Sequence, residues 1–171
     1  GENLEVLAQA LDIQGRLQLA QGQTELALNT WQQAASIYAQ IGDKARLIRS
    51  RINAAQALQA LGLYRQAQKT LTEINQTLQN QPDSTIKATG LRSLGNVLRV
   101  VGDLEQSQHM LQQSLEVATR TQSPQAISET WLSLGNTATA QQDTQAALNY
   151  YQQAATTSAS PTTRIQELGC A

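Results

Sequence analysis

The chain has 171 residues, a net charge of −1, and only 15% charged residues. This balance excludes the overall basic excess that nucleic-acid-binding domains carry. The chain also contains no run of about 18 apolar residues, so neither nucleic acid nor a membrane is an expected partner. Aromatic residues make up 4% of the chain, Phe is absent, and Ala, Leu and Gln dominate. This composition favours helix over sheet and predicts an all-α fold.

One feature organises the chain, a repeat with a period of 40 residues. Gly22, Gly62 and Gly102 keep this spacing, and Gln142 holds the fourth place. A second position stays small, and a third stays large and apolar: Ala27, Ala67, Ser107 and Ala147, then Trp31, Leu71, Leu111 and Tyr151. A fixed period of this length is typical of a helical solenoid.

In chain order, apolar residues at helical spacing predict four helix pairs. Their ranges are 3–20 with 24–40, 44–61 with 64–79, 85–101 with 104–121, and 125–141 with 144–159. Ser160-Pro161 is the start signal for a partial helix over 161–171, which would cap the fourth pair. The chain is therefore predicted to be a single domain of units 3–42, 43–82, 83–122 and 123–160, cut from a longer protein.

Capping residues follow the same frame. Thr24 is predicted to cap the second helix, and either Asp83 or Ser84 to cap the fifth. Four cap candidates lie 40 residues apart, namely Asp43, Asp83, Ser123 and Thr163. Turns, caps and core positions agree on one repeat frame, which strengthens the prediction of a solenoid.

The repeats resemble tetratricopeptide repeats, which place Leu-Gly in a first helix and Gly at the turn, followed by small and large residues in a second helix. The third unit matches with Leu94-Gly95, Gly102, Ser107 and Leu111, whereas the second departs, with Ala54-Ala55 replacing Leu-Gly. The resemblance implies a right-handed superhelix whose concave side is lined by first helices. The 40-residue period and Leu94-Gly95-Asn96 are similar to the longer repeats of kinesin-light-chain and Leu-Gly-Asn scaffold proteins.

A narrower resemblance concerns residues 11–15, 56–62, 75–79 and 160–166. These segments resemble the repeat region of cyanobacterial CHAT-domain proteins, in which a caspase-like protease domain follows the repeats. The resemblance implies that such a domain would lie beyond residue 171. The segment itself would then carry none of the protease's catalytic residues.

Placed on the concave side, the exposed residues of the first helices predict a peptide-binding groove. Amide groups can pair with a peptide backbone, and guanidinium groups can bind a carboxylate through two hydrogen bonds. The predicted groove residues are Arg16, Arg49, Asn53, Gln56, Arg92, Asn96, Arg99 and Asn136. The expected partner is a protein or peptide, including one with acidic groups. A clamp for two C-terminal carboxylates is disfavoured because Asp12, at one of its positions, has the wrong charge.

Other functional classes find less support in the sequence. His109 is the only His and is expected on the surface, and Cys170 has no partner for nucleophilic chemistry. There is no Gly-rich phosphate loop and no Cys/His metal spacing, so we expect neither an enzyme nor a cofactor. The main alternative to a binding module is a structural spacer or oligomerisation segment. An exposed repeat end would also produce end-to-end contacts, including weak dimers.

Overall fold

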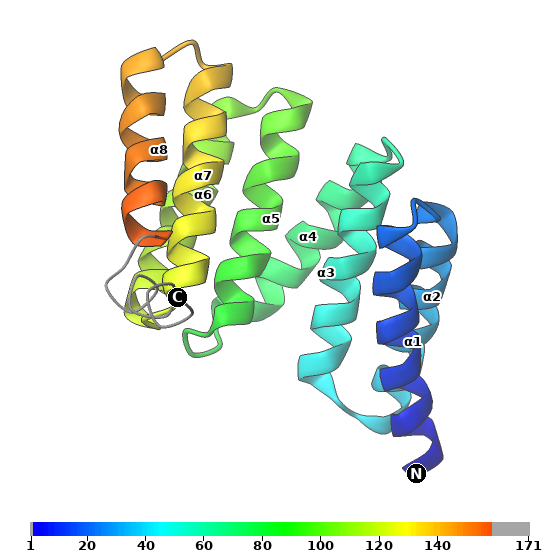
Figure 1. Cartoon of the computed structure of the whole chain (residues 1–171). Helices are drawn as coiled ribbons and strands as arrows, with labels where there is room; N and C mark the ends of the chain where they lie inside the picture. Colours follow the sequence, from blue (N-terminus) through cyan, green and yellow to red (C-terminus); the bar gives the residue numbers. More distant parts are fainter. Residues whose placement is uncertain (1, 159–171) are drawn as a thin grey trace, which may run out of the picture. The chain divides into compact units, whose positions relative to one another are not determined.

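The computed structural model describes residues 2–158, which form eight α-helices joined by short turns (Figure 1). The helices are α1 (Glu2–Ala20), α2 (Thr24–Ile41), α3 (Lys44–Ala60), α4 (Tyr64–Gln79), α5 (Thr85–Val101), α6 (Leu104–Arg120), α7 (Pro124–Ala140) and α8 (Thr144–Ser158). The described residues contain no strand, and the prediction of an all-α helical-repeat fold is confirmed. The partial capping helix predicted over 161–171 lies outside the described residues.

Backbone geometry explains why the turn signals located the helix ends so closely. Gly102 ends α5 in the left-handed conformation, with φ of 92°, and its amide N–H donates to the carbonyl oxygens of Leu98 and Arg99. Glycine adopts this conformation without steric cost. In the fourth pair Gln142 occupies the same place and adopts the same region, with φ of 64°. The turn of the repeat therefore has a left-handed backbone conformation at this position even where the residue is not glycine.

The predicted caps are confirmed at some helices and wrong at others. The Asp43 carboxylate accepts from the Arg46 amide at 3.1 Å, as expected. Ser84, and not Asp83, caps α5 by accepting from the Lys87 amide at 3.2 Å. The expectation for Thr24 is wrong, because it is the first residue of α2 and the preceding Gln23 makes no side-chain cap bond. Thr163 lies outside the described residues.

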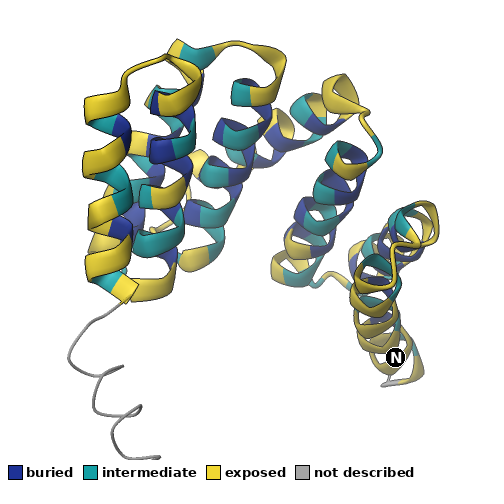
Figure 2. Ribbon diagram, turned by 45° about the horizontal axis from the view of Figure 1, so that its top comes forward, coloured by how far each residue is buried: buried dark blue, intermediate teal, exposed yellow. Residues whose placement is uncertain are grey.

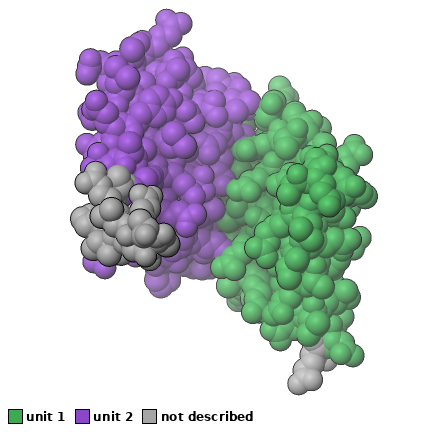
Figure 3. Space-filling view, in the orientation of Figure 1, with its two compact units in different colours: residues 1–77 green, residues 78–171 purple. Residues whose placement is uncertain are grey.

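The chain separates into two compact units, residues 1–77 and residues 78–171 (Figure 3). The boundary falls near the end of α4. The first unit holds α1 to α3 and most of α4, and the second holds α5 to α8. The single continuous array from residue 1 to residue 171 stays a prediction.

Three of the four helix pairs close through a glycine that faces a large side chain of the partner helix, and Ala55 holds this place in the α3–α4 pair. The Gly15 backbone meets the ring of Trp31, where an added Cβ would lie 2.7 Å from the ring atoms. Gly95 meets Leu111 in the same way, and Gly135 meets the Tyr151 ring. The periodic glycine and the periodic large residue are thus the two halves of one contact. The resulting buried faces line the helix interfaces in Figure 2.

Candidate functional site

Helices α5 and α7 of the second unit lie side by side, with α6 packed behind them (Figure 1). Buried hydroxyl groups fix this arrangement. The Ser107 hydroxyl donates to the Gly95 carbonyl oxygen at 2.7 Å and lies 2.9 Å from the Thr137 hydroxyl. About two turns further along α6, the Ser114 hydroxyl donates to the Ala88 carbonyl oxygen at 2.8 Å and lies 3.2 Å from the Thr130 hydroxyl. Side chains that α5 and α7 present to solvent are therefore held on a fixed frame.

One predicted groove residue, Arg92, is already paired on this face. Its guanidinium lies 3.0 Å from a carboxylate oxygen of Glu129, so the ion pair joins α5 to α7. The other oxygen of Glu129 accepts from the Gln125 amide at 3.0 Å. The positive charge of Arg92 is thus largely neutralised within the protein, and this residue does not make the face basic.

Asn96 and Arg99 differ from Arg92 because their side chains remain available. Both are half-buried and share one side of α5 at a spacing of three residues. No described residue hydrogen-bonds the Asn96 side chain or forms an ion pair with the Arg99 guanidinium. The Nε atom of Arg99 is buried and has no hydrogen-bond partner among the described residues. A buried donor without a partner carries a desolvation cost.

Asn136 holds the repeat position of Asn96 on α7 but is partly engaged. Its side-chain oxygen accepts from the Tyr151 hydroxyl at 2.8 Å, and the same hydroxyl lies 3.2 Å from that of Thr139. The third repeat has Leu111 at the position of Tyr151, which leaves Asn96 without this bond. In these contacts, the side-chain N–H donors of Asn136 have no acceptor. The α5–α7 face therefore offers amide donors from both helices beside one guanidinium.

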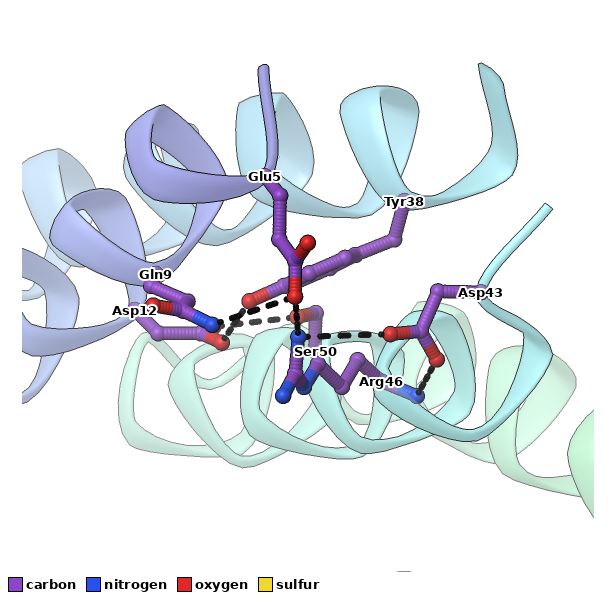
Figure 4. A network of polar contacts seen from close by, with 7 residues as sticks. All are labelled: Glu5, Gln9, Asp12, Tyr38, Asp43, Arg46 and Ser50. Carbon is purple, nitrogen blue, oxygen red and sulfur yellow. Dashed lines mark hydrogen bonds and ion pairs between the residues drawn. The ribbon is translucent and has the colours of Figure 1, made fainter. Parts of the chain in front are cut away.

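In the first unit, Asp12 proves to be a structural residue and not an exposed lining residue. Its two carboxylate oxygens accept from the Tyr38 hydroxyl at 2.8 Å and from the Ser50 hydroxyl at 3.0 Å (Figure 4). One carboxylate thereby ties α1 to both α2 and α3. Beside it, the Arg46 guanidinium pairs with Glu5 at 2.9 Å. The charge that argued against a carboxylate clamp is thus used to hold three helices together.

This network also alters the chemistry of Tyr38. Burial, followed by the hydrogen bond to the Asp12 carboxylate, raises the pKa of the Tyr38 phenol to about 12. The phenol therefore stays protonated and remains a donor throughout the physiological range. Its hydroxyl proton is engaged by the structural carboxylate of Asp12.

The four predicted groove residues of the first unit are not brought into any such network. Arg16 and Arg49 are exposed, and Asn53 and Gln56 are half-buried. None of these four side chains hydrogen-bonds or pairs with a described residue. They are solvent-facing polar residues of α1 and α3, and Arg16 and Arg49 carry positive charge.

Sequence reasoning gave too little weight to two residues of the first helices. Glu129 forms an ion pair with the Arg92 guanidinium, and this pairing is visible only in the contact between α5 and α7. Gln59 lies 40 residues before Arg99, and its Nε2 atom is likewise buried without a partner among the described residues. The period could have identified Gln59, because the same position then carries an unsatisfied donor in two consecutive repeats.

The structure shows no arrangement typical of catalysis in its described part. Within residues 2–158, no three His, Cys, Asp or Glu side chains gather as metal ligands. His109 is exposed on α6, as predicted, and its Nε2 atom lies 3.0 Å from the Gln113 amide nitrogen. Cys170 lies outside the described residues. Of the helices that the structure describes, none combines the length and apolarity needed to cross a membrane.

Comparison with known proteins supports the repeat assignment. Residues 87–158 match the family model described as Tetratricopeptide repeat. This match covers nearly all of α5 to α8, the helices of the second unit that include the α5–α7 face. No curated protein matches the sequence.

Solved structures with the same fold extend the likeness to most of the chain. BtubC (BKLC) from P. vanneervenii aligns with a TM-score of 0.74 at 21% identity, over 88% of this chain and 63% of that one. The apo form of RapI aligns with a TM-score of 0.74 at 16% identity, over 88% of this chain and 55% of that one. The chain therefore spans less than two thirds of the length of either protein.

A third similar structure has repeats of a related kind. The putative kinesin light chain from Podosopora anserina, with nearly identical TPR-like repeats, aligns at 19% identity with a TM-score of 0.64. The alignment covers 92% of this chain and 86% of that one. At these identities the likeness shows the fold alone. The fold is a helical-repeat array of the tetratricopeptide type.

Proposed function

We propose that this chain is a protein-binding module whose α5–α7 face binds an extended peptide segment with an acidic group. The acidic group contacts Arg99, and the amides of Asn96 and Asn136 pair with the peptide backbone. Tetratricopeptide repeats mediate protein–protein interaction in general, which supports the module. The observation that carries the proposal for this face is the half-buried Arg99 guanidinium, which forms no ion pair with a described residue.

Physical chemistry favours a carboxylate at this point. A guanidinium has five N–H donors and no acceptor, so it requires acceptor oxygens. Hydrogen bonds between charged groups are about twice as strong as neutral ones. Arg92 is a poorer anchor than Arg99, because binding a ligand there would compete with Glu129 at 3.0 Å. The proposal therefore places the acidic contact near the C-terminal end of α5.

In the first unit, the remaining predicted groove residues would form a separate polar surface of their own. Arg16, Arg49, Asn53 and Gln56 would provide further polar contacts along α1 and α3, and their lack of internal partners leaves them free for this. The resemblance to repeats that precede a caspase-like protease domain suggests a use for the module. In such a parent protein it would recruit a substrate or regulator, or hold the protease inactive.

The test is selection of peptides from a random display library against the full chain. The recovered peptides are synthesised, and their affinities for the wild type and for Asn96→Ala/Arg99→Ala are measured by calorimetry. The proposal expects selected peptides rich in Asp or Glu. It expects at least about a tenfold loss of affinity in the double variant, the scale of one charge-assisted hydrogen bond.

Two further variants make the result specific to this face. His109→Ala changes an exposed residue of α6 and should leave affinity unchanged. Arg92→Ala should weaken binding less than Arg99→Ala does, because Arg92 already pairs with Glu129. Equal binding to the wild type and Asn96→Ala/Arg99→Ala, or recovery of no binding peptide, would contradict the proposal.

A further inference from the structure

The third repeat (α5 and α6) and the fourth repeat (α7 and α8) differ at one position of their second helices. This position holds Leu111 in α6 and Tyr151 in α8. Leu111 packs on the backbone of Gly95, and Tyr151 packs in the same way on Gly135. Tyr151 differs by ending in a hydroxyl group, which reaches residues of the α5–α7 face. The two repeats therefore share a packing contact but differ in one hydrogen-bonding group.

The Tyr151 hydroxyl determines which atom of the Asn136 amide remains available. It donates to the Asn136 Oδ1 atom at 2.8 Å, and its oxygen lies 3.2 Å from the Thr139 hydroxyl. The Asn136 Nδ2 atom has no acceptor among the described residues and is not buried. Because the amide is planar, turning Oδ1 to the phenol leaves Nδ2, on the other branch, to meet a ligand. Asn136 is thereby held as a hydrogen-bond donor on the face.

Asn96 holds the same place in the third repeat but has no such restraint. Leu111 offers no hydroxyl group, and neither polar atom of the Asn96 amide hydrogen-bonds a described residue. An asparagine amide both donates and accepts, so a free one can bind the N–H and the C=O of one extended residue together. Asn96 is therefore available as a donor and an acceptor, whereas Asn136 is available as a donor.

Unsatisfied buried donors mark the repeats that lack the hydroxyl group. Arg99 holds the place of Thr139 in the third repeat, and its Nε atom is buried without a partner among the described residues. The second repeat has the same combination within the first unit. There the buried Leu71 holds the place of Leu111, and the Gln59 Nε2 atom is likewise buried without a partner. The repeat frame thus places a hydroxyl group introduced at Leu111 beside a donor that lacks an acceptor.

We propose that Leu111 and Tyr151 determine how the α5–α7 face binds a peptide backbone. Asn96 binds the N–H and the C=O of one extended residue, whereas Asn136 binds a C=O alone. Proline has no N–H, so the bound segment excludes proline at the residue paired with Asn96 and accepts it at the residue paired with Asn136. This inference rests on the function proposed above and specifies the backbone pattern of its peptide. Leu111 and Tyr151 are positioning residues, because they act through the two asparagines.

Methylation of one backbone nitrogen at a time tests this pattern, because it removes one N–H of the peptide and keeps the carbonyl. The probe is the tightest peptide recovered in the selection described above, and each methylated form is titrated by calorimetry. At one position, methylation should weaken wild-type binding at least about fivefold, the scale of one net hydrogen bond. This penalty should disappear in Asn96→Ala. No methylation penalty of the wild type should depend on Asn136.

Exchanging the hydroxyl group between the repeats tests the two positioning residues. Leu111→Tyr should engage the Asn96 Oδ1 atom and remove the methylation penalty, whereas the matched control Leu111→Phe adds the ring alone and should retain it. Tyr151→Phe keeps the ring that packs on Gly135 and frees the Asn136 Oδ1 atom. This variant should create a second position at which methylation weakens binding. Far-UV circular dichroism verifies that each variant keeps its helix content.

The outcomes separate this inference from the proposed function. A peptide that requires Asn96 and Arg99 but shows the same methylation penalties in the wild type, Leu111→Tyr and Tyr151→Phe would overturn this inference alone. A wild-type penalty that disappears in Asn136→Ala would do the same. Recovery of no binding peptide, or equal binding to the wild type and Asn96→Ala/Arg99→Ala, would overturn the proposed function and this inference with it.

Discussion

Replacing Gly135 with Ala tests the glycine contact that closes the α7–α8 pair. In an ordinary helix this change stabilises by about 1 kcal/mol, because alanine has the higher helix propensity. Here the added methyl group would lie 2.6 Å from Cδ1 of the Tyr151 ring. The ring cannot turn away freely, since its hydroxyl donates to Asn136 at 2.8 Å. Overpacking against a fixed group costs about 3 kcal/mol, so the net expected result is destabilisation by about 2 kcal/mol.

Urea unfolding followed by tryptophan fluorescence measures this effect locally in a Trp31→Phe background, which leaves Trp131 as the one tryptophan. Trp131 of α7 stacks on Tyr150 of α8 with ring centroids 5.8 Å apart, so its emission reports on this helix pair. The sign of the effect is the test. In a Tyr151→Ala background the ring is gone, and Gly135→Ala should then stabilise by about 1 kcal/mol. Stabilisation by Gly135→Ala in the wild-type background would refute the close contact.

Three further predictions concern single residues. Gln142→Gly should stabilise by about 1 kcal/mol in thermal unfolding, because φ at this residue is 64°; Gln141→Gly, where φ is −77°, should give no such gain. Tyr38→Phe should destabilise by about 1–2 kcal/mol in urea and remove from the ultraviolet titration the phenol whose pKa is raised to about 12. Because the Tyr38 pKa is raised on folding, its contribution is complete below pH 10 and is lost as pH rises through about 12. The hydrogen bond from Arg120 lowers the pKa of Asp83, so Asp83→Asn should lower the melting temperature at pH 7 and have progressively less effect as acid protonates the wild-type carboxyl.

The sequence predicted the helices well because several local signals marked the same boundaries. Gly102 ends α5 and Asp43 caps α3, and both lie where the 40-residue frame places them. The frame misled where two cap residues adjoin. Asp83 lies 40 residues after Asp43, yet Ser84 caps the helix while Asp83 pairs with Lys87 and Arg120. Helical spacing cannot distinguish two adjacent cap residues, because the choice depends on the backbone angles of the turn.

The candidate site was less predictable, because its properties depend on contacts between helices. Spacing placed Arg92, Asn96 and Arg99 on one side of α5, but it gave no sign that Glu129 of α7 pairs with the first of them. The sequence placed Asp12 at a position of a carboxylate clamp and gave no sign that it accepts two hydrogen bonds from other helices. A polar residue on a first helix is therefore either available or structural according to the residue opposite it, which sequence periodicity does not record.

Nuclear magnetic resonance titration with a selected acidic peptide tests the central claim most directly. The full chain is labelled with nitrogen-15, and backbone and side-chain amide shifts are followed as peptide is added. The proposed α5–α7 face predicts the largest changes at the side-chain amides of Asn96 and Asn136 and at the Arg99 Nε–H signal, with little change along the outer residues of α6 near His109. Changes centred on α6 or α8, with these three signals unmoved, would show that the face proposed here is not the binding site.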